Sequence, residues 1–232
     1  PQVIIKEVVV TATPTPVPTA TPTPIPTATP TPKPYTEVGG MLRSDTTWGL
    51  ADSPYLVTES VQIPEGITLT IEAGVEVEVS EEPSVLFNVQ GILRVHGSQM
   101  SPVYLRGTLL FPSRRHTVDA LRASLDPLVD IRFAILEGFD TFFNEMGLVG
   151  SQTTFNVSDS VFRDIPNWSY FQSGGQILIE RSRFENAAGF RFSGDNNTLS
   201  FQYNCFVSKP SVEAPWFHFG SHPTSERIVI QD

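Results

Sequence analysis

The side chains that could do chemistry are sparse in this sequence, and their spacing does not assemble a catalytic group. A hydrolytic or calcium-dependent site needs two or three carboxylates held close together. The densest such group is Asp195-Asn196-Asn197, which is typical of a turn. Asp159 and Asp164 flank one strand-like segment. The positions 22 residues further on carry Arg181 and Asn186 instead of acids. We interpret these residues as polar turns and solvated surface, and we expect no enzymatic activity.

Metal and cofactor sites are not predicted either. His218 and His222 have the i, i+4 spacing that would suit a metal on a helix, but Gly220 and Pro223 oppose a helix there. Neither a cysteine nor a carboxylate completes that set. The glutamates between positions 76 and 82 are typical of a solvated face, with weak calcium binding as the alternative.

Two kinds of residue could carry sugar. Three N-x-[ST] sequons occur, at Asn156, Asn167 and Asn196. A Thr/Pro-rich stalk is the composition that carries O-linked sugar, although an unmodified spacer is an equal alternative. The candidate threonines are Thr11, Thr13, Thr15, Thr19, Thr21, Thr23, Thr27, Thr29 and Thr31.

Those threonines belong to three tandem octapeptides, TATPTPVP, TATPTPIP and TATPTPKP, at 11–34. Proline fixes φ and removes a backbone donor, which excludes helix and sheet and favours polyproline II. At about 3.1 Å per residue such a spacer spans roughly 74 Å. We therefore divide the chain into a strand at 1–10, a Thr/Pro-rich linker at 11–36 and a domain at 37–232.

A 22-residue period organises the end of that domain. Phenylalanines recur at one position, small polar residues at a second and apolar strand residues at a third. The three sets are Phe162, Phe184 and Phe206; Ser160, Ser182 and Asn204; and Phe155, Ile177 and Leu199. A 22-residue unit with strand-like alternation matches one turn of a parallel β-helix. We predict an internal phenylalanine ladder and a polar ladder at one corner.

Upstream segments alternate in the same way, at 61–79, 85–95 and 102–105, and we expect one further strand over 129–135. The strings SPYLVTESVQIPEGITLTIEAGVEVEV and LFNVQGILRVHGSQMSPVYLRG resemble the opening rungs of right-handed parallel β-helix proteins of the pectate-lyase-like superfamily. The resemblance covers most of 44–232 and implies an all-β fold of about 22-residue rungs. It also implies a secreted or surface protein, but no single function, because that fold carries lyases, hydrolases, adhesins and structural modules.

Charge and composition narrow the partners. The formal net charge of −10 argues against a nucleic acid or an anionic membrane as partner. No run of 18 apolar residues is present to span a bilayer. The chain opens at Pro1, which fits signal-peptide removal and an extracellular or cell-surface location, although a cloned fragment would look the same. Cys205 is the single cysteine, which we interpret as inert, with an intermolecular disulfide as the alternative.

The two ends of the chain suggest self-assembly. The first segment is rich in β-branched residues: Val3, Ile4, Ile5, Val8, Val9 and Val10. The segment 226–232 resembles the rung-opening strand at 176–181, so we expect an open solenoid edge there. We predict a structural subunit of an extracellular filament, a head-to-tail homopolymer in which this strand docks on a neighbouring β-helix. The alternative is a carbohydrate-binding or polysaccharide lyase-like module on a cell-surface stalk, and a third option is an adhesin fragment.

Overall fold

The computed structural model describes residues 34–80, 85–107, 129–138, 154–166, 169–171, 176–192, 198–207, 217–219 and 227–231. The chain divides into two compact units, Pro1–Pro32 and Lys33–Asp232, and every described residue belongs to the second. The predicted strand at 1–10 and the predicted linker, except for its last three residues, therefore lie outside the described residues.

The described part of the domain is all-β, with one short 3-10 turn at Leu50–Asp52 and no α-helix. Two long sheets dominate, and a shorter one lies beside them. Sheet 1 runs through β1 (Thr36–Met41), β3 (Tyr55–Ile63), β5 (Glu76–Val79), β8 (Val103–Arg106), β10 (Ala134–Glu137), β12 (Val161–Ile165), β15 (Arg183–Ala187) and β18 (Cys205–Val207), with β6 (Phe87–Val89) also paired to β3. Sheet 2 runs through β2 (Thr46–Trp48), β4 (Thr68–Glu72), β7 (Ile92–His96), β9 (Val129–Arg132), β11 (Thr154–Ser158), β14 (Gln176–Glu180), β17 (Thr198–Gln202) and β20 (Arg227–Gln231). Sheet 3 contains β13 (Ser169–Phe171), β16 (Phe190–Phe192) and β19 (Phe217–Phe219).

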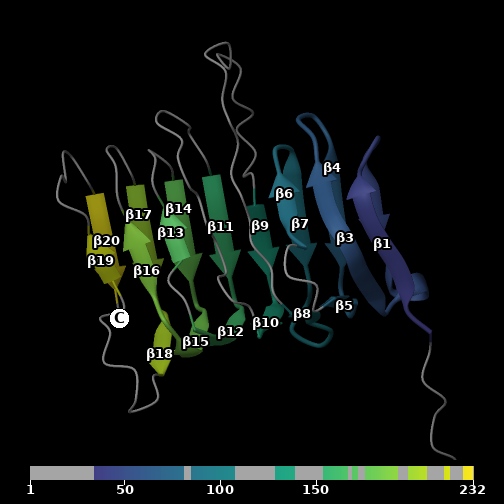
Figure 1. Cartoon of the computed structure of the whole chain (residues 1–232). Helices are drawn as coiled ribbons and strands as arrows, with labels where there is room; N and C mark the ends of the chain where they lie inside the picture. Colours follow the sequence, from purple (N-terminus) through teal and green to yellow (C-terminus); the bar gives the residue numbers. More distant parts are fainter. Residues whose placement is uncertain are drawn as a thin grey trace, which may run out of the picture. The chain divides into compact units, whose positions relative to one another are not determined.

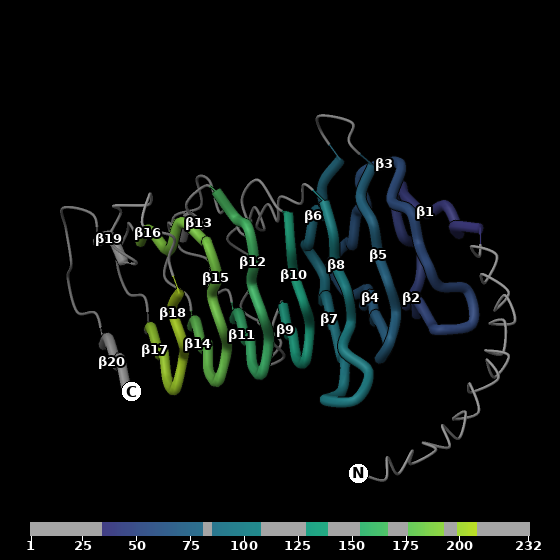
Figure 2. The backbone as a smooth tube through the Cα atoms, turned by 90° about the horizontal axis from the view of Figure 1, so that it is seen from below, coloured from purple at the N-terminus to yellow at the C-terminus, as the bar shows by residue number. Residues whose placement is uncertain are grey.

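Every ladder between these strands is parallel, and the rungs stack in chain order from β1 to β20 (Figure 1). Seen from below, β9, β11, β14 and β17 of sheet 2 each turn tightly into the next strand of sheet 1 (Figure 2). The described part of the domain is thus a parallel β-solenoid with rungs of about 23 residues. Phe155 pairs with Ile177, and Ile177 pairs with Leu199, as the 22-residue period predicts. The predicted β-helix fold is confirmed.

Inward-facing positions of both long sheets form one continuous core. Alternation places Leu69, Leu93 and Val129 on neighbouring rungs of sheet 2, and all three are buried. The phenylalanine ladder is also confirmed. Ring centroids of Phe162 and Phe184 are 4.8 Å apart, and those of Phe184 and Phe206 are 4.9 Å apart, with nearly parallel planes. Phe206 is the partly buried member of that stack. Each stacked ring removes a large apolar area from water, at roughly 25 cal/mol per Å².

The corner between sheets 2 and 1 carries the predicted polar ladder. The Ala134 amide donates to Ser160 Oγ at 3.1 Å, and the Ser160 amide donates to Ser182 Oγ at 3.2 Å. The Ser182 amide then donates to Asn204 Oδ1 at 2.9 Å. Side chains thus satisfy backbone donors at a turn that the sheet ladders do not reach.

One expected strand was wrong in its extent. The segment 129–135 is two strands, β9 in sheet 2 and β10 in sheet 1, separated by Phe133 with φ 49°. That left-handed conformation turns the chain through the corner. In the sequence, apolar residues keep alternating through Ile131, Phe133 and Ile135, but the buried residues after the turn are Ala134 and Leu136, so the inward face shifts by one residue. The alternation therefore conceals the corner in the sequence.

Candidate functional site

Asp159 and Asp164, the two acids that flank a predicted strand, form hydrogen bonds between rungs. Arg181 donates from Nε and Nη2 to the two carboxylate oxygens of Asp159, each at 2.8 Å, and also contacts Glu180. The hydrogen bonds from Arg181 lower the pKa of Asp159. Asp164 accepts a hydrogen bond from Asn186 Nδ2. These residues hold neighbouring rungs together, and both acids stand at left-handed backbone positions.

A column of alternating charge crosses the outer face of sheet 1. Arg106 Nε donates to Glu137 at 2.8 Å, and Arg163 Nε donates to Glu185 at 2.8 Å. Arg163 also contacts Glu137 at 3.4 Å, so each rung bridges to the next. These side chains are partly exposed, so each pair alone contributes about 0–1 kcal/mol. Their regular alternation fixes the rung register more than it adds stability.

The glutamates at 76 and 78 join the same column. Glu76 Oε2 lies 4.0 Å from Arg106, and Glu78 accepts a hydrogen bond from the Tyr35 hydroxyl. That hydrogen bond and the Glu78 charge raise the pKa of Tyr35. Among the described residues no three metal-ligating side chains gather.

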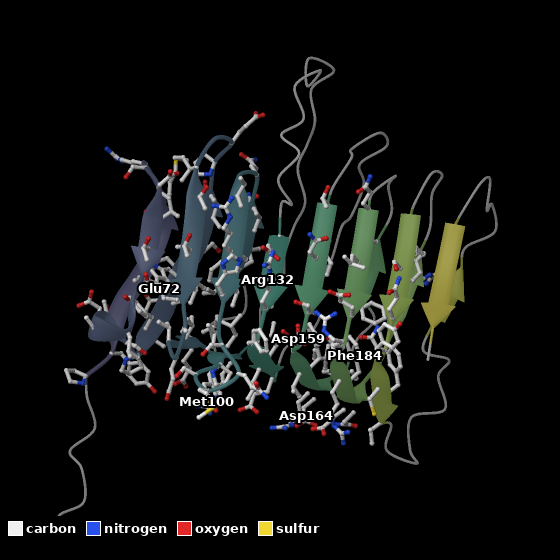
Figure 3. The ribbon with its side chains drawn as sticks, turned by 180° about the vertical axis from the view of Figure 1, so that it is seen from behind. Glu72, Met100, Arg132, Asp159, Asp164 and Phe184 are labelled. Carbon is white, nitrogen blue, oxygen red and sulfur yellow. The ribbon has the colours of Figure 1, made fainter. Side chains whose placement is uncertain are left out.

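A second cluster, on the outer face of sheet 2, was not identified from the sequence. Its members are His96 on β7 and Asp130 and Arg132 on β9. Arg132 donates from Nε to Asp130 Oδ1 at 3.0 Å and from Nη2 to Asp130 Oδ2 at 2.9 Å. His96 Nε2 lies 2.9 Å from Asp130 Oδ2. Figure 3 labels Arg132, which lies between Glu72 and Asp159 along the solenoid.

Burial differs sharply within this cluster. Asp130 is only 4% exposed, although its strand neighbours Val129 and Ile131 fill the core and it must face outward. The side chains of His96 and Arg132 keep 38% and 54% of their surfaces exposed. A buried carboxylate therefore orients two basic groups that remain open to solvent.

Register explains why the cluster forms. Strand β7 pairs with β9 so that Arg94 faces Asp130 and His96 faces Arg132. The intervening chain includes 108–128, so the step between these strands is longer than the 22-residue period by which rungs were aligned. Matching the apolar residues of LRVH at 93–96 with those of VDIR at 129–132 would have revealed the pairing.

Comparisons with known proteins add little to this geometry. No protein-family model matches the chain, and no solved structure is significantly similar. The chain is similar to Protein bark beetle of Drosophila melanogaster, with 34% identity over 73 residues. That match covers 31% of this chain and 2% of the fly protein, so the chain spans a very small part of this relative.

Most other predicted site residues fall outside the described residues. This holds for the strand residues at 3–10, the candidate threonines, Asn167, Asn196 and His222. His218 lies on β19, of which the backbone is described. The remaining sequon residue, Asn156, is half-buried on β11, next to Asp130 in register.

Two further observations concern the domain surface. Cys205 is an exposed free thiol, and its Sγ lies 3.6 Å from Arg183 Nη1. Within the described part of the chain, no helix is long and apolar enough to cross a membrane.

Proposed function

We propose that this protein is a structural subunit of an extracellular filament, without enzymatic activity. Residues 3–10 of one copy would add as a strand to the solenoid of the next copy. The solenoid would belong with the secreted members of the pectate-lyase-like superfamily, because the sequence of its first rungs resembles theirs. The observation that carries the proposal is that, among the described strands, β1 stands at the edge of sheet 1.

The edge at β1 combines free backbone groups with a thinly covered core. Within the described residues, β1 pairs with β3 alone. Its inward-facing Val38 is partly buried, whereas Val57 and Val61 one rung on are fully buried. Met41 is 62% exposed at the same edge. An added strand would pair the backbone and cover this apolar surface.

The interior rungs leave little room for such an addition. Along the main paths of sheets 1 and 2 each described strand between the end strands has a partner on both sides, while β6 beside sheet 1 pairs with β3 alone. This favours docking at an end of the solenoid over docking at its side. The eight strands of sheet 2 stack over about 34 Å at 4.8 Å per step. A polyproline II spacer of roughly 74 Å would exceed that length and could carry residues 3–10 to a neighbouring copy.

Negative-stain electron microscopy of the full chain tests the proposal, with long regular fibres as the expected result. A charge at the proposed docking edge, Met41→Asp, should abolish fibres. Met100→Asp is the matched control, because Met100 is 92% exposed in the turn between Ser98 and Ser101. Dispersed particles of the unmodified protein under all conditions, or fibres that survive Met41→Asp, would contradict docking at this edge.

A further inference from the structure

We propose that His96 and Arg132 form a binding site for a single oxyanion, a carboxylate or sulfate group on a soluble ligand. The site lies on the outer face of sheet 2 and goes beyond the proposed filament function. It does not depend on assembly, because all its groups come from neighbouring rungs of one copy.

Both basic groups have binding capacity left after they contact Asp130. Arg132 donates from Nε and Nη2 to that carboxylate, so the third guanidinium nitrogen, Nη1, can donate to a ligand. His96 uses Nε2, which leaves Nδ1. Neither Nη1 of Arg132 nor Nδ1 of His96 has a hydrogen-bond partner within the described ranges. Two polar groups are therefore oriented by a buried acid and left open to solvent.

The local charge favours an anion once His96 is protonated. Arg94 faces Asp130 in register, so a second arginine stands beside the buried carboxylate on the same face of the sheet. The other acid close to the site in register is Glu72, which faces His96 from β4. Its Oε2 lies 3.1 Å from the position that a Cβ on Gly49 would take, so this carboxylate leans toward the β2 side. The two arginines balance Asp130 and Glu72, so a protonated His96 supplies the positive excess at the site.

The histidine couples binding to pH. Because Nε2 faces a carboxylate, Nε2 carries the proton in neutral His96, and Nδ1 is then an acceptor. Protonation turns Nδ1 into a donor beside the Arg132 fork. The charged groups around the ring are Glu72, Asp130, Arg94 and Arg132. An oxyanion therefore binds more tightly when the ring is protonated.

An NMR titration tests the site in the full chain. The ring signals of His96 are identified by their loss in His96→Gln, since the chain has four histidines. Sodium sulfate and sodium acetate are titrated separately against sodium chloride at constant ionic strength. We expect a saturable shift of the His96 signals with sulfate, with acetate or with both. The dissociation constant should be smaller at lower pH. The dissociation constant should rise about tenfold or more in Arg132→Gln, from the loss of charge-assisted hydrogen bonds.

Arg106→Gln is the matched control. Arg106 is 48% exposed and paired with a carboxylate at 2.8 Å, but it lies on sheet 1, so its loss should leave the Kd unchanged. Arg132→Lys provides a second variant if Arg132→Gln unfolds, because it keeps the charge and loses the fork. Saturation by acetate would assign a carboxylate ligand, and saturation by sulfate alone would assign a sulfated one. Shifts that follow ionic strength equally in chloride, or that persist in both Arg132 variants, would overturn the site.

Discussion

At the scale of single residues, the phenylalanine ladder is the most direct link between sequence and stability. Phe184 lies between Phe162 and Phe206, with ring separations of 4.8 and 4.9 Å. Phe184→Ala should lower the free energy of unfolding by about 3–5 kcal/mol, because it leaves a cavity between two rungs. Urea denaturation measures the change. Tyr203→Ala, at an exposed aromatic, is the control and should cost much less. An equal loss of unfolding free energy in both variants would show that the stacked phenylalanine rings do not stabilise the fold more than an exposed aromatic residue does.

The ion pair at the corner predicts a pH dependence. Arg181 holds the pKa of Asp159 below its usual value in the folded state. A lowered folded pKa means that the pair stabilises the fold above the unfolded pKa, near 3.8, and that this contribution is lost as pH falls through the folded pKa. We expect the unfolding free energy to drop below about pH 4. The drop should be smaller in Asp159→Asn, as measured by denaturation between pH 7 and pH 2. An identical pH profile in that variant would contradict the assignment.

At the scale of elements, the open edge of β1 allows a selective test. The Thr36 amide donates to Pro54 O at 2.9 Å, on the β3 side. Since strand amides alternate in direction, the Glu37 amide points toward the open edge. Glu37→Pro removes that donor and should block strand addition without breaking a β1–β3 hydrogen bond. Fibres should disappear in micrographs while the thermal unfolding midpoint changes little, and Glu37→Ala should still form fibres. Fibres formed by the proline variant would exclude pairing at this edge.

Some of these strands and side-chain clusters were predicted from the sequence and others were not. The rungs from β11 to β18 were predicted from recurring residues such as Phe162 and Ser160, because the step between them is constant. The corner at Phe133 was missed, because apolar residues keep alternating in the sequence through the turn while the buried positions shift by one residue. The cluster of His96 and Arg132 was missed for another reason. The longer chain between β7 and β9 breaks the period, so only the pairing register brings these side chains together.

At the scale of the whole molecule, the proposed filament gives different roles to the solenoid, which folds by itself, and to residues 3–10, which link the copies. The described rungs form their own core and their own polar ladders, so the domain should fold without the N-terminal segment. That segment is a strong strand former, yet an isolated strand is not stable in water. Its role in the proposal is therefore to pair with a second copy.

Deleting residues 1–10 should consequently abolish fibres and leave the thermal unfolding of the domain unchanged. Ile5→Asp combined with Val9→Asp should have the same effect, because a charge would enter the neighbour's apolar edge. A conservative exchange, Ile5→Val with Val9→Ile, serves as the control and should still polymerise. Electron microscopy and calorimetry on the same samples separate assembly from folding. If the truncated chain still forms fibres, another surface links the subunits; if it unfolds, residues 1–10 belong to the core of their own domain.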